Sequence, residues 1–285
     1  MFKNLSPGAI GISATMEEGL NLAKATSFQG LDLNIGEAQK LASERSKEYL
    51  NQLWQKAGIL MGGWGLPVNW KGDDAAYHES LSRLPALAEL AVFLGCNRCI
   101  TGVAGWDDER PFKENWDFHV KRLRLPAEIL REYGHSLGIE FIAPRTSRAP
   151  HKYGFIYTMD GMLALAAAIG TGNVGLLLDT WHWYTAHATL DDLKQLSKSD
   201  IVYVHINDAP AGIDADDQID NVRCLPGETG VIPLVEILRI FKRIGYDGPV
   251  TPEPFSKKVS ELEASKAAKV TAEALDKVWQ EAGLE

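Results

Sequence analysis

Cysteine is scarce in this sequence, with three residues among 285. Three cysteines are too few for a framework of disulfides, and Cys224 has no nearby cysteine partner in the sequence. Cys96 and Cys99 form one C-x-x-C, but the second pair that would complete a zinc site of this type is missing. Both fall in a predicted strand, where residues three apart point to opposite faces. We therefore interpret Cys96 and Cys99 as core residues.

The sequence also lacks an excess of basic residues and any long hydrophobic run. Its formal net charge of −9 argues against nucleic acid or an anionic membrane as the main partner. No run of about 18 apolar residues predicts a membrane span. The first residues, MFKNLSPGAIG, do not form the apolar stretch of a signal peptide. A reducing cytoplasm is therefore the compartment that we expect.

What the sequence does contain is a regular alternation of short apolar runs and amphipathic segments. No low-complexity tract or Pro/Gly/Ser linker interrupts it, and a 45% hydrophobic content is enough for one large core. We expect one domain over residues 1–285. The predicted strands are 9–13, 30–35, 59–64, 98–103, 138–144, 174–179, 201–206 and 248–254. The clearest predicted helices are 17–26, 81–94, 118–133, 190–197, 233–244 and 262–282.

This alternation indicates an α/β fold with parallel strands and right-handed crossovers. Eight strand–helix units within about 250 residues favour a closed (β/α)8 TIM barrel. A doubly wound open sheet is the alternative. Such a sheet usually carries a glycine-rich phosphate turn after its first strand, whereas GISATMEEG follows the first predicted strand here. The barrel is therefore the fold that we predict.

The last four predicted strands carry polar residues near their C-terminal ends, where (β/α)8 barrels place their active sites. These residues are Glu140, Asp179, His205 and Glu253. Side chains alternate between the lumen and the helix layer, so inward-pointing Asp179 and His205 leave their apolar neighbours facing the helices. Three buried carboxylates raise one another's pKa, a conflict that a divalent cation removes. Oxygen ligands with one histidine suit Mn²⁺, Mg²⁺ or Co²⁺, with Zn²⁺ as an alternative.

Further residues near the predicted strand ends are candidate substrate contacts. His182 lies too far beyond the sixth strand to share its ligand position, so we assign it to the substrate. Arg223, in the long loop after the seventh strand, can bind a hydroxyl or phosphate oxygen, or it can be a solvated loop residue. We expect Glu228 to cap the helix that begins near Ile232. Tryptophans that either stack on a sugar or cover the barrel mouth are Trp64, Trp106, Trp181 and Trp183.

The C-terminal half contains a specific set of motifs: LGIEFIAPRTSR, GLLLDTWHWY, VYVHINDAP, LPGETGVIPLVEILRIFKRIGYDGPV and VTPEPF. As a set, D-T-x-H, then V-H-I-x-D and a late G-Y-x-G-x-x-x-x-E resemble the xylose isomerase-like sugar phosphate isomerase/epimerase superfamily. The resemblance implies a TIM barrel whose single divalent metal is bound by Glu140, Asp179, His205 and Glu253. It also implies that His182 contacts the substrate.

Two positions depart from one branch of this superfamily. Ketose 3-epimerases carry an arginine six residues after the seventh-strand histidine, where this sequence has Ala211. They also carry a glutamate six residues after the fifth-strand glutamate, where this sequence has Thr146. Both differences argue against a plain ketohexose epimerase. The PGE segment is more similar to members that act on inosose-type or other modified sugars.

These observations predict a metal-dependent isomerase or epimerase acting on a small sugar-like polyol ketone. The metal would polarise the substrate carbonyl and stabilise an enediolate, while Glu140 and Glu253 remove and return a proton from opposite sides. A lyase that expels hydroxide is an open alternative. An endonuclease IV-like hydrolase is disfavoured, because GGWGLP and TGVAGW after the third and fourth strands contain no histidine. A non-catalytic barrel is disfavoured because all four ligands are present. The substrate, the metal and any homo-oligomer stay open.

Overall fold

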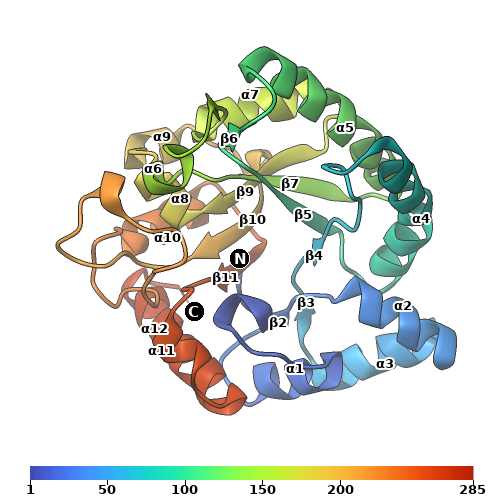
Figure 1. The fold of residues 1–285 in the computed structure, drawn as a ribbon. Coiled ribbons are helices and arrows are strands. Elements are labelled where there is room, and N and C mark those ends of the chain that lie inside the picture. The colour runs from blue at the N-terminus through green and yellow to red at the C-terminus, as the bar shows by residue number, and fades with distance from the viewer. Residues whose placement is uncertain (285) are drawn as a thin grey trace.

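Parallel strands curl into a barrel in the computed structural model, which describes residues 1–284. Figure 1 shows the strands in the middle of the molecule with the helices arranged around them. The strand order is β3-β2-β1-β11-β10-β9-β7-β5-β4. The bounds are β1 Phe2–Leu5, β2 Gly30–Leu31, β3 Leu60–Met61, β4 Trp64–Gly65, β5 Arg98–Val103, β7 Ser136–Phe141, β9 Val174–Asp179, β10 Ile201–Ile206 and β11 Pro249–Pro252.

The barrel closes through the third strand position, which is divided between β3 and β4. β3 pairs with β2, β4 pairs with β5, and only Gly62 and Gly63 separate the two halves in sequence. The nine strands of the sheet therefore occupy the eight positions of a (β/α)8 barrel, which confirms the predicted fold.

Helices follow most of the strands and cover the outside of the barrel. Those that match the predicted helices are α1 Met16–Lys24, α4 Asp74–Phe93, α5 Phe112–Glu132, α9 Leu190–Lys194, α10 Leu234–Arg243 and α12 Ala264–Glu281. The further helices are α2 Ile35–Glu44, α3 Lys47–Ala57, α6 Arg145–Arg148, α7 Met159–Ile169, α8 Thr180–Thr185 and α11 Lys257–Ser260. Within residues 1–284, no helix combines the length and the apolar character that crossing a bilayer requires.

The predicted position of the first strand, 9–13, is wrong. The first strand is β1, Phe2–Leu5, and it pairs with β2 and β11. Two polar residues in β1, Lys3 and Asn4, keep this strand from reading as an apolar run. Asn4 is buried and hydrogen-bonded to side chains of three other strand segments, while the Lys3 ammonium pairs with Asp276 on α12. A strand in which both faces carry polar groups loses the apolar signal on which the prediction depended.

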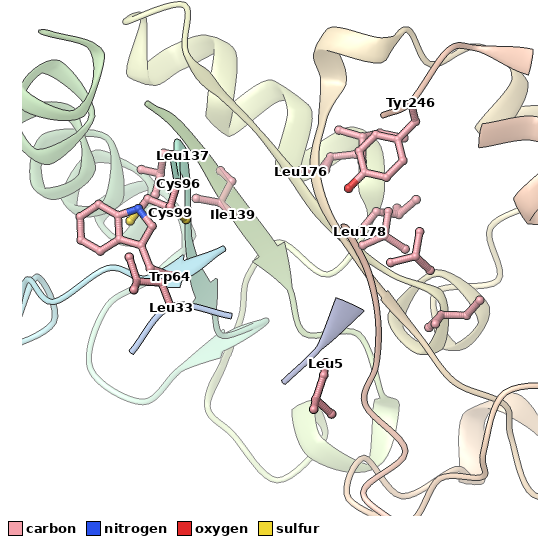
Figure 2. Packing of buried hydrophobic residues seen from close by; sticks show 14 of the residues in the cluster. Leu5, Leu33, Trp64, Cys96, Cys99, Leu137, Ile139, Leu176, Leu178 and Tyr246 are labelled. Carbon is pink, nitrogen blue, oxygen red and sulfur yellow. The ribbon is translucent and has the colours of Figure 1, made fainter. Parts of the chain in front are cut away.

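The apolar core lies between the strands and the helices, and Figure 2 shows part of it. Trp64 on β4 pairs in register with Cys99 on β5, which in turn pairs with Leu137 on β7. Cys96 and Cys99 are both buried, as predicted, although Cys96 precedes the strand that contains Cys99. Burial raises the pKa of the Cys96 thiol to about 12. The C-x-x-C therefore belongs to the core.

A tyrosine side chain lies in the lumen below the C-terminal ends of the strands. Tyr203 on β10 is fully buried, and its hydroxyl reaches Asp32 just after β2 at 2.8 Å and Thr251 on β11 at 2.6 Å. A Cβ at Gly63 would lie 2.7 Å from the Tyr203 ring. Because a methyl group cannot fit at that distance, the missing side chain at Gly63 leaves the space in which the ring crosses the barrel.

Loops at the C-terminal ends of the strands surround the barrel mouth. Short strands β6 (Trp106–Asp107) and β8 (Tyr153–Gly154) follow β5 and β7 and pair with each other in antiparallel fashion. The long segment between β10 and α10, orange in Figure 1, loops out beside α6 and α8. Its contacts with the strand ends form part of the site described next.

Candidate metal centre

Four side chains from consecutive strand positions converge at the C-terminal ends of the strands. Glu140, Asp179, His205 and Glu253 each offer one potential ligand atom, and these atoms all lie within 4.8 Å of one another. His205 Nδ1 lies 3.2 Å from Glu140 Oε1 and 3.3 Å from Glu253 Oε2. The parallel register explains the convergence, because His205 stands beside Asp179 on one side and Thr251 on the other.

Three members of the cluster, His205, Glu253 and Asp179, have shifted pKa values. Burial lowers the pKa of His205, but the Glu253 and Glu140 carboxylates outweigh it and raise that pKa to about 10. Burial raises the pKa of Glu253 to about 7, against the opposing charges of His205 and Arg223. Burial also acts to raise the pKa of Asp179, but Arg223 overcomes this effect and holds it well below its ordinary value. Protons and one arginine thus compensate the three acids.

Asp179 is fixed from two sides. Its Oδ1 accepts hydrogen bonds from the Trp181 backbone at 2.8 Å and from Asn207 Nδ2 at 3.0 Å. Its Oδ2 accepts from Arg223 Nη1 at 2.7 Å. Such partners orient a carboxylate before any ion arrives and are typical of the groups that support metal ligands. Asn207 lies two residues after His205, so strand alternation was a signal that could have identified it.

Arg223 is part of this cluster, so the solvated-loop alternative is wrong. The side chain is 4% exposed although it belongs to the long loop after β10. Its Nη1 also lies 3.1 Å from Glu253 Oε2, and its Nη2 donates to Asp220 Oδ1 at 2.8 Å. The guanidinium carbon lies 5.2 Å from the Trp181 ring centroid. Arg223 therefore holds two of the clustered acids in place.

Asp208 anchors the loop that carries Arg223. Its carboxylate accepts backbone hydrogen bonds from Thr229 at 3.0 Å, Gly230 at 2.7 Å and Ile232 at 2.9 Å. Its backbone also pairs with that of Cys224. Sequence analysis missed this residue, although it is the D of the V-H-I-x-D motif. With the bond from its neighbour Ala209, this buried carboxylate has four backbone donors, which fix the path of the loop and, through it, the position of the guanidinium.

The predicted cap at Glu228 is wrong. Glu228 Oε2 accepts from the Leu225 backbone at 2.9 Å, so the side chain closes the turn before the helix. α10 begins at Leu234, and its N-cap residue Pro233 makes no side-chain capping bond. Proline fixes the backbone angle φ near its helical value, so the helix can begin without a capping side chain.

His182 lies directly beside the four clustered residues. Its Nε2 is 3.7 Å from Asp179 Oδ2 and 3.5 Å from Arg223 Nη2, and its Nδ1 accepts from the Ala143 backbone at 3.4 Å. The ring is 1% exposed, and burial lowers its pKa. The structure thus places His182 next to the predicted ligands, where its contact with a substrate stays a prediction.

The tryptophans occupy different places. Trp64 is 1% exposed and packs edge-on against His135, but it also lines a cavity beside the ends of β1, β2 and β4, so its contact with a substrate stays a prediction. Trp181 is fully buried under Arg223, and Trp183 is buried as well. Trp106 on β6 is half-buried and stacks on the ring of His151 with centroids 4.7 Å apart. Trp106 is the tryptophan of this set that stands in a loop at the mouth.

The charges of the cluster match a divalent cation. Three carboxylates lie around the site, and Arg223 compensates one of their negative charges. The remaining two are balanced by an ion of charge two, provided that His205 gives up its proton and binds as a neutral imidazole. Carboxylate oxygens and one imidazole nitrogen are a donor set that such ions accept. The residues present therefore fit the predicted metal.

Residues 20–279 match the family model described as xylose isomerase-like TIM barrel. The chain belongs to this family. A relative named inosose isomerase from Halalkalibacterium halodurans is 28% identical over 200 residues, covering 69% of this chain and 67% of the relative. The solved structure of a xylose isomerase domain protein from Alicyclobacillus acidocaldarius is 30% identical, with a TM-score of 0.90 and 99% of each chain covered. A structure of the protein IolI with a bound zinc atom shares the fold, with a TM-score of 0.80, 19% identity and 98% of each chain covered.

Proposed function

We propose that this protein is a divalent-metal-dependent isomerase or epimerase that transfers a proton on a sugar-like polyol ketone. The observation that carries the proposal is the convergence of Glu140, Asp179, His205 and Glu253 at the barrel mouth. Membership of the xylose isomerase-like family supports an enzyme that acts on sugars. The relatives named inosose isomerase favour a cyclic polyol ketone as the first substrate to test.

The four residues would hold the cation, and its chemistry would be to polarise a carbonyl and stabilise the negative charge that develops on the oxygen. Asp179 and His205 come from the two middle strands of the group, β9 and β10, and serve to bind. Glu140 on β7 and Glu253 after β11 come from its two ends. They can thus reach a bound ketone from two sides, which suits one carboxylate for removing the proton next to the carbonyl and the other for returning it.

Two neighbouring side chains support these roles. Arg223 keeps Asp179 ionised and orients both Asp179 and Glu253 through its contacts at 2.7 Å and 3.1 Å. His182, whose Nδ1 accepts from the Ala143 backbone, presents its Nε2 toward the same group. A neutral imidazole in that position can donate a hydrogen bond to a substrate oxygen. Both groups position the reactants and leave the proton transfer to the glutamates.

Proton exchange with solvent tests the proposal directly. The protein is loaded in turn with Mn²⁺, Mg²⁺, Co²⁺ and Zn²⁺ and incubated in D2O with ketoses, inososes and 3-keto-glycosides. We expect NMR to show deuterium at a carbon next to the carbonyl, and we expect a chelator to stop the exchange. A product lacking the elements of water would identify the lyase alternative. Metal-loaded protein that exchanges no proton in any of these ketones would overturn the proposal.

A further inference from the structure

The barrel mouth has a second polar wall, across the lumen from the clustered acids. A cavity of about 460 Å³ lies at the C-terminal ends of β1, β2 and β4 and the loops that follow them. β2 occupies the position opposite β9 in the ring of eight strand positions. Polar residues that line this cavity are Ser6, Ser13, Thr15, Asp32, Asn34 and Glu37.

Asp32 is the deepest charged group of this wall. Its Oδ1 is saturated, because it accepts from Asn4 Nδ2 at 2.9 Å, from the Gly63 backbone at 2.9 Å and from the Tyr203 hydroxyl at 2.8 Å. Its Oδ2 shares the same Tyr203 hydroxyl at 2.9 Å, and Ser6 contributes a further side-chain hydrogen bond to the carboxyl group. The groups facing Asp32 are thus hydrogen-bond donors and not cations. Oδ2 keeps acceptor capacity that these partners do not fill.

Asp32 is also linked to the proposed metal centre. The Tyr203 ring, whose hydroxyl bonds to Asp32, packs edge-on against the His205 ring with centroids 5.4 Å apart. The buried Tyr203 side chain therefore contacts both walls. A ketone held at the acids of β7, β9, β10 and β11 would extend its far end across the mouth toward the half-buried Asp32.

We propose that Asp32 determines substrate specificity by accepting a hydrogen bond at Oδ2 from a hydroxyl group remote from the reacting carbonyl. The cavity would then take the uncharged, hydroxylated end of a polyol. This inference rests on the proposed function and adds its substrate class. An analogue without that hydroxyl would cover Oδ2 and leave this acceptor unpaired, which binding sites penalise strongly. A phosphate in its place would meet the negative charges of Asp32 and Glu37.

Substitution of Asp32 by asparagine isolates the oxygen in question. In Asp32→Asn, the amide oxygen can keep the place of Oδ1, with its bonds from Asn4, Gly63 and Tyr203. The amide nitrogen then replaces Oδ2, so that a donor stands where an acceptor stood. The matched control is Asp191→Asn, which removes the same charge from a side chain that is 82% exposed on the surface of α9.

The experiment compares kcat/KM for an inosose with kcat/KM for its monodeoxy analogues, using Mn²⁺-loaded protein. We expect wild type and Asp191→Asn to discriminate roughly tenfold or more against an analogue lacking one hydroxyl remote from the carbonyl. In Asp32→Asn this ratio should fall toward one, while metal content and the melting temperature stay close to those of wild type.

The outcomes separate this inference from the function on which it rests. Absence of proton exchange in every ketone would mean that the proposed function fails. Turnover with equal kcat/KM for all monodeoxy analogues would refute the hydroxyl subsite alone. Unchanged discrimination in Asp32→Asn would show that another residue selects the hydroxyl. If Asp32→Asn does not fold, Ser6→Ala is tested instead. This variant removes a neighbouring donor from the Asp32 carboxyl group and should shift the same ratio of kcat/KM values.

Discussion

Arg223 Nη1 donates to Asp179 Oδ2 across 2.7 Å, and both side chains are almost completely buried. This bond joins the long loop after β10 to the end of β9, and it places a permanent positive charge against a proposed metal ligand. The loop is therefore part of the site even though it belongs to no strand. Its effect on the metal-free protein can be measured separately from activity.

Removal of this guanidinium should destabilise the metal-free protein. We expect Arg223→Ala to lower the free energy of unfolding by about 3–5 kcal/mol, because it leaves buried carboxylates without their partner. A divalent cation should recover more stability in the variant than in wild type, since it supplies the missing charge. Urea titrations with and without chelator measure both effects. Arg83→Ala, at a side chain 63% exposed, is the control, and equal stability of Arg223→Ala and wild type would contradict the expectation.

Alanine variants of the two histidines of the site should differ in metal content. His205→Ala removes a proposed ligand, so both the metal content and the turnover should fall. His182→Ala leaves the four ligands intact, so the metal should be retained while KM rises or kcat falls. Elemental analysis of the purified variants, with exposed His78 replaced by alanine as a control, measures the difference. The reverse pattern would show that the roles of His205 and His182 are exchanged.

Metal binding should strengthen as the pH rises. In the metal-free protein the pKa of His205 is raised to about 10 and that of Glu253 to about 7. A raised folded-state pKa contributes stability below the unfolded value, and this contribution is lost as the pH rises through the folded value. The metal-free protein should therefore lose stability between about pH 5 and 10, where the cation can displace these protons more easily.

Melting temperatures measured with metal and with chelator across this range test the expectation. The difference between the melting temperatures with metal and with chelator should increase with pH. Each displaced proton should strengthen metal binding by up to about tenfold per pH unit. Calorimetry in buffers of different ionisation enthalpy should also record proton release on binding. A gap that stays constant or narrows toward high pH would mean that the cation does not compete with these protons.

The two glutamates should be separable as proton-transfer groups. Glu140→Gln and Glu253→Gln keep an oxygen ligand and the side-chain shape but remove the base, so each should lose roughly 10²-fold or more in turnover. Metal affinity should fall less than with alanine. If the two carboxylates act on opposite sides, one variant should still wash deuterium into the substrate without forming product. Near-normal turnover in both variants with metal bound would leave Glu140 and Glu253 as ligands only.

The sequence predicted the second half of the barrel better than the first, and strand length explains why. β5, β7, β9 and β10 each contain six residues and read as apolar runs with few polar interruptions. β2, β3 and β4 contain two residues each, and β1 is polar at Lys3 and Asn4. Short strands give too few residues for a periodic signal. The four clustered residues were predictable because they stand in or just after the later strands.

The opposite wall of the mouth was not predictable in the same way. Asp32 and Tyr203 meet across 171 positions of the chain, and no local pattern records such a contact. Asp32, within the predicted strand 30–35, was visible as a polar residue in an apolar run, but its partners were not.

The fully buried Tyr203 ring packs against His205 and occupies the lumen below the C-terminal ends of the strands. We therefore expect the proposed site to be reached from the mouth. Substrate and product would then enter and leave through the same mouth of the barrel, one after the other. Solvent protons would arrive by that route as well. Product should therefore compete with substrate for the free enzyme. A bound polyol that covers the mouth would shield both glutamates from solvent, so the glutamate that returns a proton should take it up from water between turnovers, while the mouth is open.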